Sequence, residues 1–402
     1  MNDLPIKGRR AFIKQAMVAS ASLVASTSYA SANASALSNS LGIPFYGKHQ
    51  AGIATPAQKH IYFIVLDLHT EDLAKIKKLF QLWTDYSVKL TAGQKVRSYS
   101  DNRYIPPNDT GEAESLAAHQ LTLTFGISPD FFEKLNISHL KPNEFNTLPH
   151  FPRDQLQERY IKGDICIQAC ADDPQVAFHA VRNLVRAGRG EITPRWSQMG
   201  FNSFEGNDTP RNLFAFKDGT ANQTSEKELN NAVWYQGDNW LNGGSYLAVR
   251  RIKTFLETWD RTNLASQEET FGRHRHSGAP MGGKAEFEAV DLDKKDAKGN
   301  LQIPEDSHVH LAKKTGMTIL RRSFSYASGV DEHGQLDAGL LFISFQNSPE
   351  RFIKLQNSFG NTDRLNEYIT HIGSGLFACF AGVKEGEYLG QALFEQALSK
   401  SK

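Results

Sequence analysis

Hydrophobic and polar positions along the chain form segments that predict strands and helices in a regular order. Four segments of the first half are apolar or alternate with period two, which predicts strands at residues 60–68, 119–128, 163–171 and 192–201. Three segments between them carry apolar residues at helical spacing, which predicts helices at residues 71–90, 129–135 and 173–188. This order of elements predicts an α+β unit of the ferredoxin-like type, with helices and an antiparallel sheet.

The second half of the chain repeats this order. Strands are expected at residues 244–254, 317–326, 339–346 and 375–383, and helices at residues 255–262, 266–274 and 349–359. We therefore expect two ferredoxin-like domains, an N-terminal one over residues 56–203 and a C-terminal one over residues 204–402. The segment 274–312 is long, charged and rich in glycine, and such a loop within a domain is usually functional or disordered.

Residues 1–30 have the composition of an export signal, with a basic start, a short apolar stretch and small residues at the end. The apolar stretch is too short for a membrane helix, which needs roughly 20 apolar residues. Adjacent Arg9 and Arg10 in GRRAFIK match the twin-arginine pattern, and an ordinary secretory leader is the alternative. Ala30 and Ala34 both end credible cleavage sites. We expect export to the periplasm.

The charge balance excludes some classes of partner. Of the 402 residues, 45 are Lys or Arg and 44 are Asp or Glu, which leaves a formal net charge of +1. A nearly neutral chain has no overall field that would attract nucleic acid or a membrane surface, so we expect neither partner and no membrane span. Residues 31–55 are small and polar, and they predict a flexible arm between the signal and the first domain.

The chain has three cysteines, Cys166, Cys170 and Cys379. Cys166 and Cys170 lie in one predicted strand, where a separation of four residues puts them roughly 13 Å apart. This distance excludes a disulfide between them. Because no further Cys or His lies near them in the sequence, we expect buried, unreactive thiols rather than a metal site.

Two short segments carry candidate chemistry. Asp218 lies in AFKDGTANQ, where an Asp followed by Gly is ordinarily a turn. His308 and His310 lie in EDSHVHLA, which we expect to be extended, so that both would face the same way. They are either an exposed pair or a site that points into a cavity. A zinc site is weakly indicated, because no third ligand occurs at a recognisable spacing.

Several motifs occur in the chain in one order: NLFAFKDGTANQ, GGSYLAVRRIKTFLETWDRT, FGRHRHSGAP, DSHVHLA, ILRRSFSY and LDAGLLFISFQ. Together they make the chain resemble the dye-decolourising (DyP-type) haem peroxidases over roughly residues 55–395. Within that family the likeness is to the exported deferrochelatase/peroxidase branch of bacterial iron-uptake systems. The resemblance implies two ferredoxin-like domains, with one haem b per chain bound in the C-terminal half.

The resemblance implies roles for individual residues. His308 matches the proximal histidine that binds the haem iron, and His310 stands where the family often has Arg. Asp218 matches the distal acid of the family's G-x-x-D-G motif, although Ala215 replaces its first glycine. Arg321 matches the distal arginine.

Three further residues complete the expected site. Gly219 and Thr220 directly follow the acid, and we expect them to lie against the porphyrin. Asp337 precedes GLLF and is expected to accept a hydrogen bond from the ring of His308.

The implied function is reduction of hydrogen peroxide with oxidation of small organic electron donors. An imidazole on one face of a haem leaves the other face open, where a carboxylate transfers a proton and an arginine stabilises negative charge. Two alternatives stay open: a deferrochelatase that releases iron from haem and leaves the porphyrin intact, and a non-catalytic protein that binds or delivers haem. The resemblance also suggests components of an iron-uptake system as partners, and a homodimer.

Overall fold

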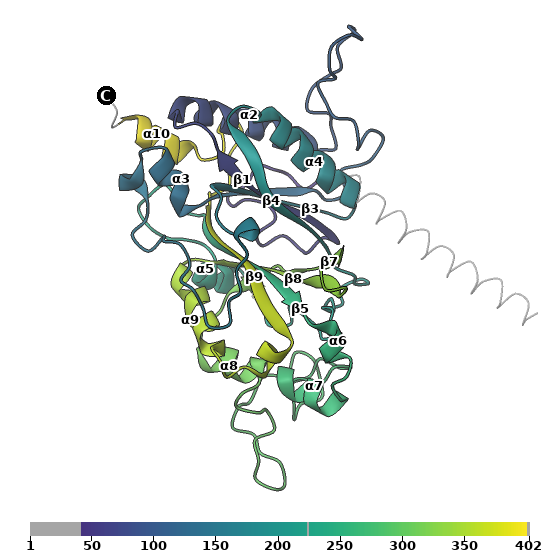
Figure 1. Cartoon of the computed structure of the whole chain (residues 1–402). Coiled ribbons are helices and arrows are strands. Elements are labelled where there is room, and N and C mark those ends of the chain that lie inside the picture. The colour runs from purple at the N-terminus through teal and green to yellow at the C-terminus, as the bar shows by residue number, and fades with distance from the viewer. Residues whose placement is uncertain (1–41, 223–224, 400–402) are drawn as a thin grey trace, which may run out of the picture.

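The structure is a computed structural model of the chain, and it describes residues 42–222 and 225–399. The export signal predicted at residues 1–30 and the first part of the predicted arm, residues 31–41, lie outside the described residues. In the part that is described, no helix is long and apolar enough to cross a membrane. Figure 1 shows the N-terminal half, with α2 and α4, above the C-terminal half, with α8 and α9.

The N-terminal half contains an antiparallel sheet in the strand order β2-β3-β1-β4. Its strands are β1 (His60–Leu68), β2 (Thr122–Ile127), β3 (Ile165–Ala171) and β4 (Ile192–Phe201). Its main helices are α2 (Leu73–Thr91), α3 (Pro129–Lys134) and α4 (Pro174–Ala187). The side chains of Asp72 and Asp173 accept hydrogen bonds from the first backbone N–H groups of α2 and α4, so each helix begins at a capping acid.

The C-terminal half contains a second antiparallel sheet in the order β9-β5-β8-β7, with β6 also paired to β8. Its strands are β5 (Ser245–Thr254), β6 (Leu320–Arg321), β7 (Phe324–Val330), β8 (Leu336–Gln346) and β9 (Ile369–Cys379). Its helices are α5 (Glu226–Ala232), α6 (Leu256–Trp259), α7 (Leu264–Phe271), α8 (His308–Lys314) and α9 (Pro349–Phe359). The last helix, α10 (Gln391–Ser399), returns to the N-terminal half, where Phe394 packs on Phe80 of α2 (Figure 1). The expectation of an α+β fold with antiparallel sheets is confirmed.

The two sheets are joined at both edges. Strand β2 pairs with β9 through Gly126 and Ile127, and β4 pairs with β7 at Phe201. All nine strands in the described part of the chain therefore belong to one sheet, which closes on itself through the pairing of β5 with β8. The sequence predicted the strands of the N-terminal half but not this connection between the halves. In the C-terminal half it predicted a single strand at residues 317–326, where the structure has two, β6 and β7.

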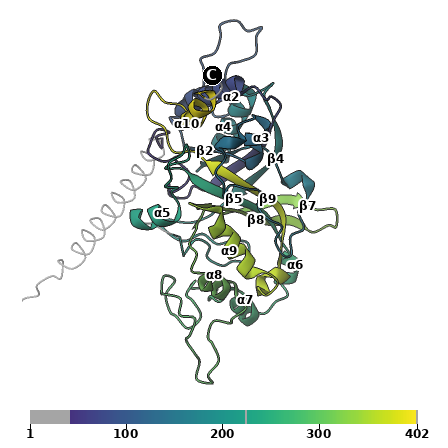
Figure 2. The same cartoon turned by 90° about the vertical axis from the view of Figure 1, so that its left-hand side faces the viewer.

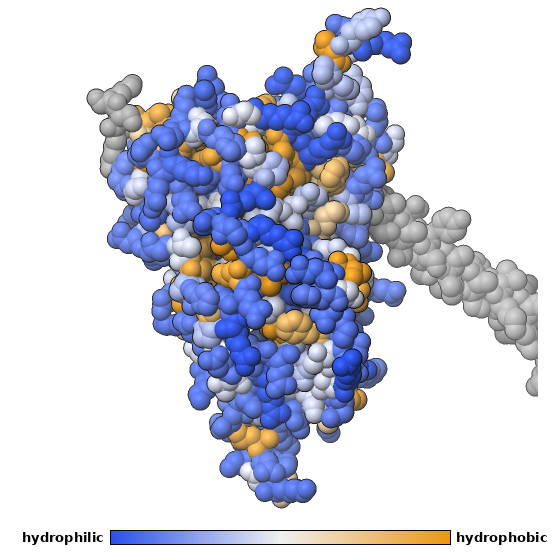
Figure 3. Space-filling view, viewed as in Figure 1, coloured by the Kyte–Doolittle hydropathy of each residue, from blue (hydrophilic) through white to orange (hydrophobic). Residues whose placement is uncertain are grey.

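The two halves also share a hydrophobic core. It combines buried side chains from both sheets, among them Phe63 of β1, Val249 of β5 and Phe377 of β9. A second cluster lies around α2 and α4, where Trp83 is fully buried and its indole N–H donates to the carbonyl of Leu184 at 2.8 Å. Most of the face shown in Figure 3 is hydrophilic, with apolar residues gathered only in small groups.

Residues 42–55 are packed against the two halves, which corrects the expectation of a flexible arm for this part of the chain. Gln50 is buried, and its amide N–H groups donate to the carbonyls of Phe125 at 2.9 Å and Phe380 at 3.0 Å. Its amide oxygen accepts from the N–H of Phe125 at 2.8 Å. One glutamine thus bridges the junction between β2 and the segment after β9.

The three cysteines are free and buried, as the sequence predicted. Burial raises the pKa of each thiol, and for Cys166 the neighbouring Cys379 raises it further. A thiol that stays protonated is a poor nucleophile, so these side chains act as small apolar core residues.

Candidate active site

A cavity of about 300 Å³ lies in the C-terminal half. Its walls come from β5, β6 and β8, from helices α8 and α9, and from the loop that precedes α5. Figure 2 shows α8 and α9 beside one another below β8. Most of the wall is apolar, with Ile252, Phe271, Phe342 and Phe359 among its side chains. Such a wall suits a large apolar ligand, and a few polar groups within it would fix the ligand's orientation.

His308 lines this cavity as the first residue of α8. Its ring Nδ1 lies 2.7 Å from Oδ2 of Asp363, and the ring stacks on Phe359 with centroids 4.4 Å apart. An ionised carboxylate only accepts hydrogen bonds, so Nδ1 is the donor to Asp363, and Nε2 is the ring nitrogen left for a metal. The imidazole is therefore held in one orientation with one nitrogen available to a metal.

Asp337 does not contact His308, so the predicted pairing of these two residues is wrong. The carboxylate of Asp337 accepts from the guanidinium of Arg251 at 2.9 Å, and Arg251 is itself buried. The partner of His308 is instead Asp363, which precedes a short 3₁₀ helix and is 4% exposed. The sequence offers several acids after the histidine, and only the packing of α8 against the end of α9 selects one of them.

The segment that holds His308 is also a helix rather than the predicted extended segment. Successive residues of a helix turn by about 100°, so His308 and His310 point in different directions. His308 lines the cavity, whereas His310 is buried outside it. The expectation that the two histidines face the same way is therefore wrong.

Asp218 and Arg321 form an ion pair in the wall of the same cavity. Oδ1 of Asp218 lies 3.1 Å from Nη2 of Arg321, and the two side chains are 15% and 28% exposed. Asp218 comes from the loop before α5, and Arg321 comes from β6, about a hundred residues later. The pair brings together an acid that can transfer protons and a permanent positive charge.

The loop around Asp218 contains two residues with left-handed backbone conformation. Ala215 has φ of 66° and Gly219 has φ of 114°. Glycine adopts such angles without strain, whereas alanine does not. The backbone is thus left-handed at position 215, where the resemblance implies glycine. Because alanine stands there instead, the backbone of Ala215 is strained.

Thr220 lines the cavity, and Gly219 does not. The hydroxyl of Thr220 donates to Oε1 of Glu286 at 2.9 Å, and Lys217 forms an ion pair with the same carboxylate. Burial alone would raise the pKa of Glu286, but hydrogen bonds from Lys217, Thr209 and Thr220 lower it. Glu286 therefore ties the loop of Asp218 to the long segment between α7 and α8.

Three further polar residues of the wall were not predicted from the sequence. Burial lowers the pKa of Arg273, and the nearby charge of Arg321 lowers it further. Arg250 is fully buried and paired with Asp154, and its Nε and Nη1 have no hydrogen-bond partner. Burial, together with Arg250 and His308, lowers the pKa of His371 to about 3, which keeps this imidazole neutral. Arg250 and His371 lie in apolar strands, where the sequence gives no signal for them.

The chemistry of this wall fits an iron porphyrin. A porphyrin presents a flat apolar ring, two carboxylates and a metal that accepts an imidazole nitrogen. The cavity offers an apolar wall, the buried Arg250 and the half-buried Arg273, and one oriented imidazole on His308. The unpartnered N–H groups of Arg250 in particular leave donors available to a polar group.

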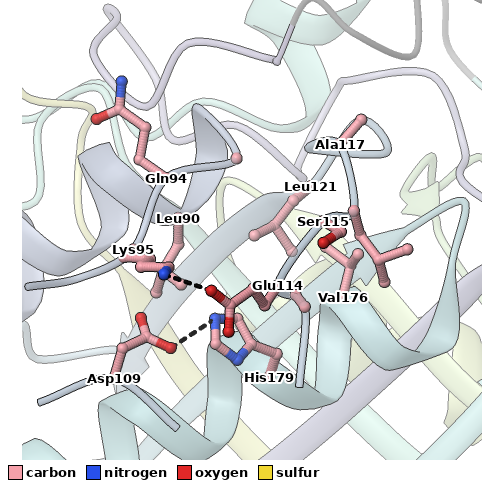
Figure 4. Close-up of a pocket in the computed structure, with 13 residues that line it drawn as sticks. Leu90, Gln94, Lys95, Asp109, Glu114, Ser115, Ala117, Leu121, Val176 and His179 are labelled. Carbon is pink, nitrogen blue, oxygen red and sulfur yellow. Dashed lines mark hydrogen bonds and ion pairs between the residues drawn. The ribbon is translucent and has the colours of Figure 1, made fainter. Parts of the chain in front are cut away.

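A second, smaller pocket lies in the N-terminal half. Its volume is about 90 Å³, and Figure 4 shows Lys95 paired with Glu114 and His179 next to Asp109. Burial lowers the pKa of His179, and the charge of Asp109 partly offsets this effect. Within residues 42–222 and 225–399, no group of three or more His, Cys, Asp or Glu side chains is arranged to hold a metal ion.

Comparison with known proteins identifies the chain. The family described as "Dyp-type peroxidase, N-terminal" matches residues 50–202, and "Dyp-type peroxidase, C-terminal" matches residues 209–384. The fold and these matches define an enzyme of the peroxidase class. The chain belongs to the DyP-type peroxidase family, which confirms the resemblance read from its motifs.

Relatives and solved structures agree with this assignment. Deferrochelatase from Escherichia coli strain K12 is 36% identical over 370 residues, which cover 87% of this chain and 86% of that protein. Ferric DtpA from Streptomyces lividans superposes with a TM-score of 0.82 at 35% identity, over 89% of this chain and 98% of that one. A DyP-type peroxidase from Cellulomonas bogoriensis superposes with a TM-score of 0.82 at 34% identity, over 89% and 99% of the two chains.

Proposed function

We propose that this chain binds one haem b in the C-terminal cavity and reduces hydrogen peroxide at the expense of small organic electron donors. Hydrogen peroxide takes up two electrons and two protons and leaves as two molecules of water. The electrons come from the donor. The observation that carries the proposal is the presence of an oriented imidazole and an acid–arginine pair in one apolar cavity.

In this proposal His308 holds the iron through Nε2. Haem, when bound, supplies an iron that binds peroxide and exchanges electrons with it. The carboxylate of Asp363 fixes the ring and makes Nε2 a stronger ligand, because it stabilises positive charge on the imidazole. The buried Arg250 and the half-buried Arg273 are the cations that would face the two porphyrin carboxylates.

Asp218 and Arg321 move protons and stabilise charge. The carboxylate of Asp218 takes a proton from one oxygen of hydrogen peroxide and returns it to the other, so that the O–O bond breaks and the second oxygen leaves as water. Two electrons from the donor and two protons then convert the first oxygen into the second water. The guanidinium of Arg321, 3.1 Å from that carboxylate, stabilises the negative charge that develops on the leaving oxygen. The apolar wall limits the access of water and so strengthens both effects.

The test is the rate of reaction of the haem-loaded enzyme with hydrogen peroxide. Asp218→Asn keeps the size of the side chain but removes its ability to accept the proton, so the rate constant should fall by about 10²–10⁴-fold, or roughly 3–5 kcal/mol of barrier. Haem affinity should be unchanged. Asp260→Asn, which changes an exposed acid at the end of α6, is the matched control. A wild-type rate for Asp218→Asn would refute the assigned role.

A second candidate function is release of iron from haem with the porphyrin intact, supported by the name of the relative that covers 87% of this chain. In that reaction two protons replace the iron on the pyrrole nitrogens. Product analysis separates the two: iron release yields fluorescent metal-free porphyrin, whereas peroxidase turnover yields oxidised donor and intact haem. A protein that only carries haem yields neither and has no use for the pair of Asp218 and Arg321.

The proposal also places the protein in the periplasm, in bacterial iron acquisition. Its support is the twin-arginine pattern at Arg9 and Arg10 and the name of the relatives. Changing both arginines to Lys should retain the protein in the cytoplasm. Fractionation of the cells measures this directly, and export of the changed protein would contradict the twin-arginine route.

A further inference from the structure

The backbone of Arg321 lies at an edge of the sheet. Arg321 is opposite Ser344 of β8, and the next residue, Arg322, donates its N–H to the carbonyl of Ile343 at 2.8 Å. Successive residues of a strand direct their backbone groups to opposite sides, so the N–H and C=O of Arg321 point away from β8. Strand β6 is only two residues long, and β8 makes no hydrogen bond to the backbone N–H and C=O of Arg321.

The side chain of Asn222 satisfies both of these groups. The N–H of Arg321 donates to Oδ1 of Asn222 at 2.9 Å, and Nδ2 of Asn222 donates to the carbonyl of Arg321 at 2.8 Å. One carboxamide thus makes the two hydrogen bonds that a neighbouring strand would make. No side chain other than asparagine has this donor and acceptor at this length.

Asn222 belongs to the same short turn as Asp218. The N–H of Asn222 donates to the carbonyl of Gly219 at 2.9 Å, and Gly219 has the left-handed φ of 114° that closes the turn. The turn therefore contacts both ends of Arg321: Asp218 contacts the guanidinium and Asn222 contacts the backbone. Movement of Arg321 relative to Asp218 requires loss of at least one of these contacts.

We propose that Asn222 is a positioning residue that sets the distance between Asp218 and Arg321. The inference rests on the proposed function of that pair. Asn222 contributes no proton and no charge to the reaction. It holds the strand that carries the arginine to the loop that carries the acid, so that both groups meet hydrogen peroxide in one fixed arrangement.

The test is a double-mutant cycle on the haem-loaded enzyme, with the second-order rate constant for hydrogen peroxide as the measurement. Asn222→Ala should lower this rate constant by roughly 10-fold, since a small misplacement of a reacting group is expensive. In an Arg321→Leu background the same change should have less than about a 2-fold effect, because the residue that Asn222 positions has lost its charge. Haem affinity and the absorption spectrum of the resting enzyme should match those of the wild type.

Two further variants separate positioning from folding. Asn222→Asp keeps the size of the side chain but removes the donor to the carbonyl of Arg321, and it should be as slow as Asn222→Ala. Asn202→Ala is the matched control, because Nδ2 of Asn202 donates to the carbonyl of Ser323 at 2.8 Å, two residues along the same segment. It removes a comparable hydrogen bond without touching Arg321, so it should react at the wild-type rate. Melting temperatures of all variants show whether each one folds.

Each outcome has one interpretation. An equal loss from Asn222→Ala in both backgrounds, or wild-type rates for both Asn222→Ala and Asn222→Asp, overturns the positioning role and leaves the proposed function intact. Wild-type rates for Asp218→Asn and Arg321→Leu instead overturn the proposed function, and the positioning role with it. A slow Asn202→Ala would show that any loosening of this segment slows the reaction, which also overturns a specific role for Asn222.

Discussion

Replacement of Asp363 by Asn tests which carboxylate orients the imidazole of His308. Asp363 accepts two hydrogen bonds, from Nδ1 of His308 at 2.7 Å and from the N–H of Leu365 at 2.9 Å. Asparagine has one acceptor oxygen and so satisfies only one of them. Its amide N–H₂ group then faces the other donor, or His308 moves its proton to Nε2, where it blocks metal binding.

The size of the effect follows from the geometry. A hydrogen bond to a charged group contributes about 1.5–3 kcal/mol, and the carboxylate of Asp363 is only 3% exposed, so solvent replaces little of it. Asp363→Asn should therefore weaken haem binding by about 10–100-fold. Titration of the haem-free protein, followed by haem absorbance, measures the dissociation constant.

Asp337→Asn is the matched control for this experiment. It disturbs the ion pair with Arg251, which lies buried between the rings of Tyr160 and Tyr326, so it should lower the melting temperature and leave the affinity for haem near the wild-type value. If Asp337→Asn weakens haem binding and Asp363→Asn does not, the arrangement of α8 and the assignment of its partner acid are both wrong.

Three other predictions concern stability and reactivity. Ala215→Gly removes left-handed backbone strain of about 1–2 kcal/mol and adds an entropic cost of folding of about 0.5–1 kcal/mol. Chemical unfolding should therefore show a variant that is more stable by up to about 1 kcal/mol. A less stable variant would contradict the strain at Ala215. The thiols of Cys166, Cys170 and Cys379 should react with a thiol reagent at pH 8 only after unfolding, and fast labelling of the native protein would contradict their burial. The pKa of His371 is about 3 in the folded protein and about 6.5 in the unfolded chain. Between about pH 3 and pH 6.5 the unfolded chain therefore binds one more proton at this residue than the folded protein does, which favours unfolding as the pH falls. His371 should therefore contribute a fall in stability of about 2 kcal/mol from pH 7 to pH 5, and His371→Gln should remove that contribution in chemical unfolding at the two pH values.

Local pattern was sufficient for most of the elements. Strand β4 and helix α9 begin and end where the hydrophobic period predicted, because a period of two or of 3.6 residues is present within the segment itself. Helix α8 was misread as extended, since seven residues with two histidines carry too few apolar positions to show a helical period. Helices α5 and α10 were missed as well, the first because its seven residues are mostly polar.

The residues of the candidate site fall into two groups, those in recognisable motifs and those that only the structure singles out. Asp218, His308 and Arg321 lie in short contiguous motifs, so the resemblance to the DyP-type peroxidases singled them out, and the structure places all three in one cavity. Asp363 and Asn222 are different, because their importance lies in what they contact. Nothing in the sequence distinguishes Asp363 from Asp337, or Asn222 from any other polar residue of a turn.

The sequence by itself thus determined most of the strands and helices, the α+β class and the motifs that carry the family resemblance, because each of these is set by side chains close together along the chain. Only the tertiary structure decided that the two sheets join into one, that residues 42–55 pack across the junction, and that Asp363 rather than Asp337 holds His308. The physical reason is that such contacts join residues tens to hundreds of positions apart. Their partners are chosen by how whole elements pack, and local periodicity carries no information about that choice.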